Sequence, residues 1–284
     1  MLGDSMVEAA QVDDRQTAAF LLEESLRQHF PGVEVRNLGI SSAGLVHYHA
    51  RWARWGRTMD ADLVIVAVFG LNDFRNCSTE LESFRAMRPY YVEQQGTIIA
   101  TFRQPEAPSF SPLRLWAHRA TRGLELVRLL RDVKAARQEE GDGGQPGFLD
   151  ATIFVPDPPP PWPEAVARGV EYLRELIRET FAEGVPILVV YLPWRVEAID
   201  SEWADFASRD DRLDRWRPRR LVEDVAGSES ARFLSFTDVV AGLPAETKRD
   251  VWHVETDSHL SAVGNRLLAE ALKAPVTEIL EAPD

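Results

Sequence analysis

A serine stands in the triplet Gly3-Asp4-Ser5, directly after Leu2 at the start of the chain. A serine hydroxyl is a poor nucleophile at neutral pH, so it needs a base that accepts its proton during attack. Of the six histidines, only His259 has a carboxylate two residues before it, Asp257, next to the start of a predicted helix. Histidine suits this task because its ordinary pKa is about 6.5. These residues predict a nucleophile, Ser5, a base, His259, and a carboxylate, Asp257, that orients the imidazole.

Two further polar motifs follow predicted strands. The segment "NLGISSAG" spans Asn37 to Gly44, and "GLND" spans Gly70 to Asp73. Open α/β folds bind ligands at the carboxyl ends of their strands, so we expect both motifs to lie on the same edge of the sheet as Ser5. Attack on an ester carbonyl places negative charge on oxygen, and each preorganised donor there is worth about 3 to 4 kcal/mol.

In order along the chain, these four motifs resemble the SGNH (GDSL) hydrolase superfamily. That family has a GDS serine, a glycine-containing loop after the second strand, a G-x-N-D motif and a C-terminal Asp/His pair. The resemblance covers most of the chain in layout and leaves its middle outside. It implies a flavodoxin-like three-layer α/β/α fold and a serine ester hydrolase that acts through an acyl-enzyme intermediate.

The resemblance also implies which groups would form the oxyanion hole. These are the backbone N–H of Ser5, a backbone N–H in the second motif and the side-chain amide of Asn72. The family's usual glycine, counted from Asn37, falls at Ser42 here, while a glycine stands at Gly44, so both positions are candidates. Asp73 is expected to tie down its own loop by hydrogen bonds. The residues that bind substrate are left open.

Each of these residues also has an ordinary structural interpretation. Ser5 could cap a helix, and His259 could cap the last helix or fill a gap in the core. Asp257 could serve only as a charge at a helix N-terminus, and Glu255 competes with it as the group that orients the histidine. The agreement of four motifs in order favours the catalytic interpretation.

Helical and strand patterns alternate along the rest of the chain. Helices are predicted over residues 13–30, 45–57, 164–183, 213–225 and 261–280, and strands over 33–40, 62–70, 185–193 and 231–238. The strands at 62–70 and 185–193 are almost unbroken apolar runs, which is typical of a parallel sheet buried on both faces. The pattern predicts one α/β domain over residues 1–284, a three-layer sandwich with a mainly parallel central sheet.

The stretch from about residue 79 to 163 breaks this alternation. It holds a short strand pattern, "GTIIATF", a helical pattern over 113–139, and the clusters "GDGGQPG" and "PDPPPPWP", which predict a flexible loop and an extended polyproline segment. We interpret it as an insertion that covers the active-site edge. The aromatic residues in and near it would line an acyl or sugar pocket or pack in the core: Tyr90, Tyr91, Trp162 and Trp194.

Composition limits the partners. The net charge of −13, from 45 acidic and 32 basic side chains, repels nucleic acid and anionic membrane surfaces. No run of 18 apolar residues is present, so no membrane span is predicted. Neither a metal-ligand spacing nor a GxGxxG motif appears, so no metal or other cofactor is expected. His47 and His49 point to different faces of a helix, and the single cysteine, Cys77, is expected to be buried.

Only Met1 and Leu2 precede the serine triplet, whereas a central strand needs about five residues. We therefore expect the natural chain to be longer, with an upstream segment that could carry an export signal or an anchor. Cellular location and oligomeric state are left open.

The sequence thus predicts hydrolysis of a small-molecule or glycan ester, such as a carbohydrate O-acetyl ester. One alternative is a polysaccharide O-acetyltransferase with the same three residues, because some relatives with an Asp-x-His ending transfer the acyl group to a sugar. Another is an inactive carbohydrate-binding or scaffolding module, which the short first strand suggests.

Overall fold

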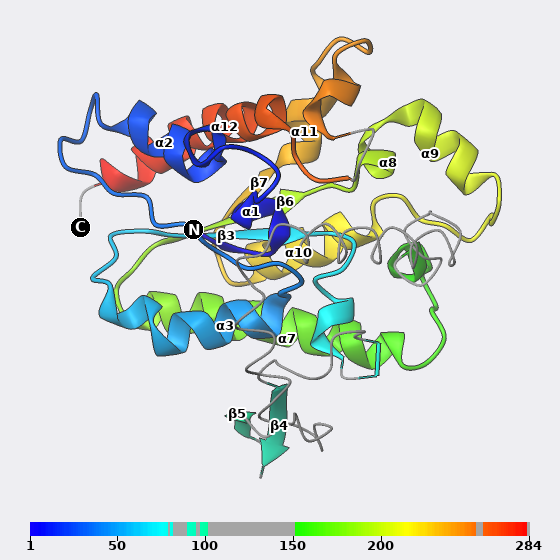
Figure 1. The fold of residues 1–284 in the computed structure, drawn as a ribbon. Helices are drawn as coiled ribbons and strands as arrows, with labels where there is room; N and C mark the ends of the chain where they lie inside the picture. The colour runs from blue at the N-terminus through cyan, green and yellow to red at the C-terminus, as the bar shows by residue number, and fades with distance from the viewer. Residues whose placement is uncertain (79, 82–89, 95–96, 102–150, 254–257, 283–284) are drawn as a thin grey trace, which may run out of the picture. The chain divides into compact units, whose positions relative to one another are not determined.

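The computed structural model describes residues 1–78, 80–81, 90–94, 97–101, 151–253 and 258–282 (Figure 1). The chain divides into two compact units. The first comprises Met1–Glu82 and Ile153–Asp284, and the second comprises Ser83–Thr152. The sequence predicted one domain with an insertion over residues 79–163. That this insertion covers the active site stays a prediction.

A five-stranded sheet forms the centre of the first unit. Its strands are all parallel, in the order β2-β1-β3-β6-β7. Their bounds are β1 (Leu2–Gly3), β2 (Leu38–Gly39), β3 (Val64–Phe69), β6 (Ile187–Leu192) and β7 (Arg232–Ser235). Every residue of β3 and β6 is buried, as their apolar runs predict. The chain leaves β1 toward β2 on one side, and β3 lies on the other, so a ligand crevice is expected at the carboxyl ends of β1 and β3.

The pairing within the sheet is uneven. β3 and β6 pair along their whole length, from Val64 opposite Ile187 to Phe69 opposite Leu192. β1 pairs with β2 at only two residues, and with β3 only at Leu2 opposite Val66. The strand predicted over residues 33–40 is therefore wrong in length, because β2 can pair only where the two-residue β1 offers a partner.

Helices cover both faces of this sheet (Figure 1). On one face lie α2 (Ala18–Leu26), α11 (Phe236–Ala241) and α12 (Ala262–Leu280), with α2 packed against α12. On the other lie α3 (Leu45–Arg54), α7 (Trp162–Ala182) and α10 (Arg217–Ser228), with α7 packed against both α3 and α10. The predicted three-layer α/β/α sandwich with a parallel central sheet is confirmed.

Short helical segments connect these elements. They are α1 (Ser5–Glu8), η1 (Asp14–Gln16), η2 (Gly56–Thr58), η3 (Arg75–Cys77), η4 (Thr152–Phe154), α8 (Arg195–Ala198), α9 (Asp200–Ala207) and η5 (Lys248–Val251). The sequence patterns did not predict α8 or α9. Helix α9 mixes polar and apolar residues, and the rings of Trp203 and Phe206 make tilted or edge-on contacts with Phe154 and with each other. Contacts with a distant segment therefore hold this helix in place.

The structure corrects part of the prediction for the proline-rich segment. Trp162 and Pro163 are not extended but begin α7, whose first turn tolerates proline because its N–H groups need no helical partner. Trp162 and Trp194 are buried, with 1% and 4% of their surface exposed, and the Trp194 ring is tilted against Phe154 and edge-on to Phe206, so both tryptophans pack in the core.

In the second unit, β4 (Tyr90–Gln94) and β5 (Thr97–Thr101) pair antiparallel, and β5 confirms the strand pattern "GTIIATF". The predicted helix at 113–139 and the "GDGGQPG" loop lie outside the described residues. In the parts of the chain that the structure does describe, no helix is both long enough and apolar enough to cross a bilayer.

Candidate active site

Ser5 is the first residue of α1, immediately beyond the carboxyl end of β1. Asp4 caps this short helix, because its carboxylate accepts the Met6 N–H at 2.8 Å. A side chain at Gly3 would come within 2.2 Å of the Val7 side chain, so this tight connection from strand to helix requires glycine. The hydroxyl of Ser5 is therefore held, half-buried, at the edge of the sheet where a ligand crevice is expected.

A main-chain clamp holds His259. Residues 251–253 run antiparallel to residues 259–261, with Trp252 opposite Leu260. The His253 N–H donates to the His259 carbonyl at 2.9 Å, and the Ser261 N–H donates to the Val251 carbonyl at 2.9 Å. Ser261 also caps α12 by accepting N–H groups of its first turn. The base of the His259 loop is thus fixed to the rest of the first unit.

This clamp places His259 beside Ser5. The imidazole Nε2 of His259 lies 2.7 Å from Oγ of Ser5. Another possible acceptor, Oδ2 of Asp4, is 3.5 Å from the same hydroxyl, beyond the usual length of an O–H···O bond. The Ser5 hydroxyl is therefore placed to give its proton to His259. Asp257 and Glu255, the two predicted candidates for orienting His259, lie outside the described residues.

Asp4 is a fully buried carboxyl group beside this pair, with a role that no sequence pattern indicated. Desolvation raises its pKa to about 6. Hydrogen bonds from Met6 N–H and Asn72, the charge of His259 and the weaker contact of the Ser5 hydroxyl oppose that rise. The sequence feature that could have indicated a role for Asp4 is its position between the strand and the nucleophile.

The second motif contains the two backbone N–H groups predicted as candidates for the oxyanion hole, those of Ser42 and Gly44. Gly44 N–H already donates to Nδ1 of His47 at 3.0 Å, inside the first turn of α3. Ser42 has a φ of 57°, in the left-handed region, and no acceptor for its N–H is found among the described residues. Ser41, just before it, donates its N–H to the Glu8 carboxylate at 2.7 Å, so this loop is held against α1.

The third motif follows β3. The carboxylate of Asp73 accepts hydrogen bonds from the Tyr48 hydroxyl and the Phe69 N–H, both at 2.8 Å. Asp73 is fully buried, and desolvation raises its pKa well above the ordinary range. It ties down its loop, as the sequence predicts, and so fixes Asn72. Asn72 is half-buried and hydrogen-bonds the Asp4 carboxyl next to Ser5.

The second and third motifs are locked together by a residue that the sequence analysis missed. Asn76 donates its side-chain amide to the carbonyls of Ser42 and Ala43, at 3.0 and 3.1 Å. A side chain at Gly44 would lie 2.4 Å from the Asp73 carbonyl oxygen, so the two loops approach too closely for any other residue. Asn76 follows the third motif by three residues, and nothing in that spacing indicates the contact.

The other residues that the sequence singled out have structural surroundings. Nδ1 of His47 accepts the Gly44 N–H, whereas Nε2 of His49 lies 3.2 Å from the Glu179 carboxylate, so the two imidazoles serve different neighbours. Cys77 is buried, as expected.

Comparison with known structures supports the fold. The chain is similar to the acetyl xylan esterase AlAXEase, with a TM-score of 0.52 and 13% identity over 97% of this chain and 98% of that one. It is also similar to a lipase/acylhydrolase from Enterococcus faecalis, with a TM-score of 0.51 and 12% identity over 100% of this chain and 97% of that one. No curated protein matches the sequence.

The model of the GDSL-like lipase/acylhydrolase family matches residues 1–267, a span that begins before Ser5 and ends after His259. The chain therefore belongs to the GDSL-like lipase/acylhydrolase family.

Proposed function

We propose that this protein is a serine hydrolase that cleaves a carboxylic ester through an acyl-enzyme formed on Ser5. The observation that carries the proposal is the 2.7 Å contact between Oγ of Ser5 and Nε2 of His259. Membership in an acylhydrolase family gives the reaction class, and this contact supplies a nucleophile with a base at hydrogen-bond distance.

In the first step, Oγ of Ser5 attacks the ester carbonyl carbon while Nε2 of His259 accepts the hydroxyl proton. The tetrahedral intermediate collapses when the carbon–oxygen bond to the alcohol breaks. His259 then gives its proton to the leaving alcohol, and the acyl group remains on Ser5. Asp257, two residues before the histidine, is the carboxylate that we assign to orient its ring.

The negative charge that develops on the carbonyl oxygen needs donors. We assign this role to the N–H groups of Ser5 and Ser42 and to the side-chain amide of Asn72. Ser42 is favoured over Gly44 because Gly44 N–H is already bonded to His47. The Asn76 bonds to the Ser42 and Ala43 carbonyls hold this stretch of backbone in one orientation before substrate arrives.

In the second half of the reaction, water attacks the acyl carbon with His259 as base. The bond to Oγ of Ser5 breaks, the hydroxyl regains a proton from His259, and the carboxylic acid is released. Asp4 acts as a positioning residue in both halves, because its carboxyl group bonds Met6 N–H and Asn72 behind the nucleophile.

The test is a panel of p-nitrophenyl esters from acetyl to palmitoyl, run on the wild type, Ser5→Ala and His259→Ala. Each variant should lose at least about 10³-fold in kcat/KM, since the two groups act as a unit. Ser25→Ala is a matched control, because Ser25 Oγ only bonds the Leu22 carbonyl within α2, and it should keep full activity.

A fluorophosphonate probe gives a readout besides turnover. It should label wild-type protein at the peptide that contains Ser5, and it should leave Ser5→Ala unlabelled. Equal turnover in wild type and Ser5→Ala, or labelling at another residue, would remove Ser5 from the mechanism.

A further inference from the structure

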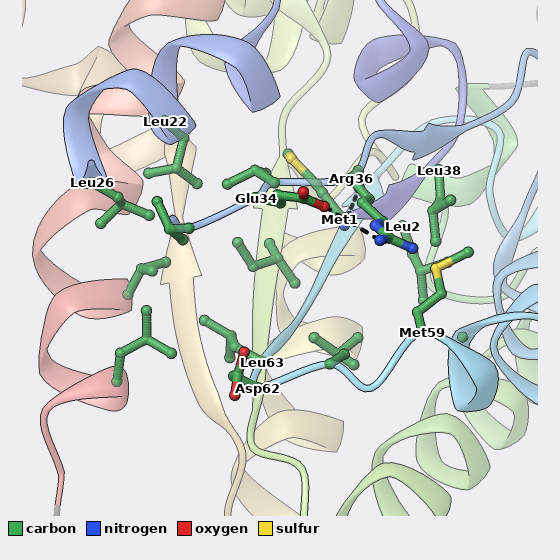
Figure 2. A pocket seen from close by; sticks show the side chains of 18 of the residues that line it. Met1, Leu2, Leu22, Leu26, Glu34, Arg36, Leu38, Met59, Asp62 and Leu63 are labelled. Carbon is green, nitrogen blue, oxygen red and sulfur yellow. Dashed lines mark hydrogen bonds and ion pairs between the residues drawn. The ribbon is translucent and has the colours of Figure 1, made fainter. Parts of the chain in front are cut away.

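The cavity of about 410 Å³ that Figure 2 shows lies beside the amino end of β3, with Leu63 and Val64 in its lining. Asn72, the side-chain donor assigned to the oxyanion hole, follows the carboxyl end of the same strand. The six residues of β3 span about 20 Å, so the cavity is too far from Asn72 to position it. The side chains that can hold Asn72 are those buried at the carboxyl ends of β3 and its neighbours.

Asn72 lies in a turn, residues 70–74, that continues directly from β3. The start of the turn is tied to the neighbouring strand, because the Gly70 N–H donates to the carbonyl of Leu192, the last residue of β6, at 3.1 Å. Further along, the turn is tied to α3, because the Tyr48 hydroxyl donates to the Asp73 carboxyl group at 2.8 Å. The position of Asn72 therefore depends on supports on both sides of it in the chain.

A second tyrosine fills the space against Gly70. Tyr191, in β6, is fully buried, and a Cβ atom placed on Gly70 would come within 2.1 Å of its hydroxyl oxygen. The hydroxyl therefore lies directly against the Gly70 main chain, at the place that a side chain would occupy. Any movement of the first residue of the turn toward β6 is blocked by this phenol.

Glu197 holds the Tyr191 hydroxyl in place. Its carboxyl oxygens lie 2.9 and 2.7 Å from the hydroxyl oxygen, and both side chains are fully buried. Glu197 is the third residue of α8, and its carboxyl group accepts the N–H of Trp194, the residue before this helix, as a glutamate at that helical position commonly does. The Glu197 carbonyl accepts from Nε of Arg215 at 2.7 Å. The carboxyl group thus has a fixed position from which it holds the tyrosine.

We propose that Glu197 and Tyr191 are positioning residues for catalysis, which hold the Gly70 end of the turn so that the Asn72 amide stays aimed at the developing oxyanion. This inference rests on the proposed function, and it gives a task to a buried acid and a buried phenol that the proposed chemistry does not use. The turn then has a tyrosine–carboxyl pair on each side of Asn72, Tyr191 with Glu197 and Tyr48 with Asp73. Misplacing a catalytic group by about 1 Å can cost about 100-fold in rate, so loss of this support should appear in kcat.

The first test removes the parts of the support one at a time. Tyr191→Phe keeps the ring and loses the hydroxyl, and it should lower kcat for p-nitrophenyl acetate about 10- to 30-fold with less than about a threefold change in KM, since the donor acts on charge that develops in the transition state. Glu197→Leu removes the partner of that hydroxyl and should lower kcat to a similar extent. Glu197→Gln keeps an acceptor for Tyr191 and should retain kcat within about threefold at pH 7.

Thr180→Val is the matched control, because it also removes one buried hydroxyl, which donates to the Leu176 carbonyl within α7. This variant should keep kcat. Amide hydrogen exchange in residues 70–74 should be at least about tenfold faster in Tyr191→Phe and Glu197→Leu than in Thr180→Val. In a protein that already carries Asn72→Ala, adding Tyr191→Phe should change kcat by less than about twofold, because the donor on which the tyrosine acts is gone.

The inference is overturned if Tyr191→Phe keeps kcat while Ser5→Ala and Asn72→Ala lose it, and in that case the proposed function stands. Additive losses in the double variant, unchanged exchange in residues 70–74, or an equal loss in Thr180→Val would overturn it as well. An unchanged kcat in Asn72→Ala would remove both the assignment of this donor and the inference. Full turnover in Ser5→Ala would instead overturn the proposed function. Where Tyr191→Phe does not fold, Glu197→Leu carries the same comparisons.

Discussion

The side-chain amide of Asn76 donates a hydrogen bond to the carbonyl of Ser42 at 3.0 Å, and this bond joins the loops that follow β2 and β3. A second bond from the same amide reaches Ala43. Both loops carry groups that we assign to the oxyanion hole. A fully buried residue whose amide donates to these two carbonyls thus sets the spacing between two of the proposed donors.

Replacing Asn76 by alanine should lower kcat for p-nitrophenyl acetate by about 10- to 100-fold, with a smaller change in KM. The carbonyls of Ser42 and Ala43 would lose their donor, and the Ser42 N–H would no longer be held in one orientation. Steady-state kinetics at 25 °C, with folding checked by circular dichroism, measure the effect.

Thr180→Ala provides a matched control for Asn76→Ala, because Thr180 is also fully buried and its hydroxyl donates to the Leu176 carbonyl within α7. This variant should lose stability and keep kcat. A loss of kcat in Thr180→Ala as large as that in Asn76→Ala would mean that Asn76 acts through overall stability alone.

Ser42→Gly should retain activity within about threefold and raise stability by roughly 0.5 to 1 kcal/mol. The residue has a left-handed φ of 57°, which glycine adopts without strain, and the donor assigned to this position is a backbone group. Urea denaturation and ester kinetics check the two halves of the prediction. A tenfold loss of activity would show that the Ser42 hydroxyl, and not its N–H, contributes.

Asp4→Asn should flatten the dependence of stability on pH between about 4 and 6. In the folded protein the pKa of Asp4 is raised to about 6 from an ordinary 3.8, so the folded state binds this proton more tightly than the unfolded state. The stabilisation is complete below pH 4 and is lost as pH rises through 6. Linkage over this shift amounts to roughly 2 to 3 kcal/mol.

The measurement for Asp4 is the free energy of unfolding of wild type and Asp4→Asn at intervals from pH 4 to 8. The groups that face Asp4 are Ser5, His259, Asn72 and Asp73, and all of them remain in the variant. The stability of Asp4→Asn relative to wild type should therefore rise through this window and stay constant above pH 7. A constant difference throughout would contradict the raised pKa.

Glu197→Gln should stabilise the protein at pH 9 more than at pH 5. Burial raises the pKa of Glu197 to about 8, and the Tyr191 hydroxyl oxygen lies 2.9 and 2.7 Å from its two carboxyl oxygens, with one of which its O–H forms a hydrogen bond. The stabilising contribution of the protonated group is present below pH 4.5 and is lost as pH rises through 8. A glutamine keeps an acceptor for Tyr191, and the variant should gain roughly 3 to 5 kcal/mol relative to wild type over this range.

The Tyr191 hydroxyl is held in place on its other side by Gly70, where a side chain would come within 2.1 Å of it. Urea denaturation of Glu197→Gln and wild type at pH 5, 7 and 9 tests this prediction. Glu197→Leu is the complementary variant, because it removes the acceptor as well as the charge. It should show the same pH trend as Glu197→Gln with lower stability at every pH, and parallel pH profiles of wild type and Glu197→Gln would refute a raised pKa.

The sequence was sufficient to predict the contact between Ser5 and His259 because each residue stands in a motif at the end of a predicted element. The sequence did not indicate the position of the Asp4 carboxyl group or the contacts of Asn76. The role of Asn76 depends on carbonyl groups 33 and 34 residues away, and that of Asp4 depends on burial beneath loops from other parts of the chain. Local patterns carry no information about such contacts.

The fold shows the same division. β3 and β6 could be predicted from the local sequence, since each is an apolar run too short for a helix, which is typical of a strand buried on both faces. The length of β2 could not, because it depends on pairing with β1, a strand more than 30 residues away in the sequence. Helix α9 was missed because its aromatic residues meet a partner, Phe154, from another segment.

The contact between Ser5 and His259 joins residues separated by 254 positions. During synthesis the hydroxyl leaves the ribosome long before the imidazole, which follows only after all five strands of the parallel sheet. A nascent chain that ends before His259 cannot contain the pair. If esterase activity depends on this pair, it will appear only late in translation, and a cut in the polypeptide that releases the segment after η5 will abolish turnover even where Ser5 itself is untouched.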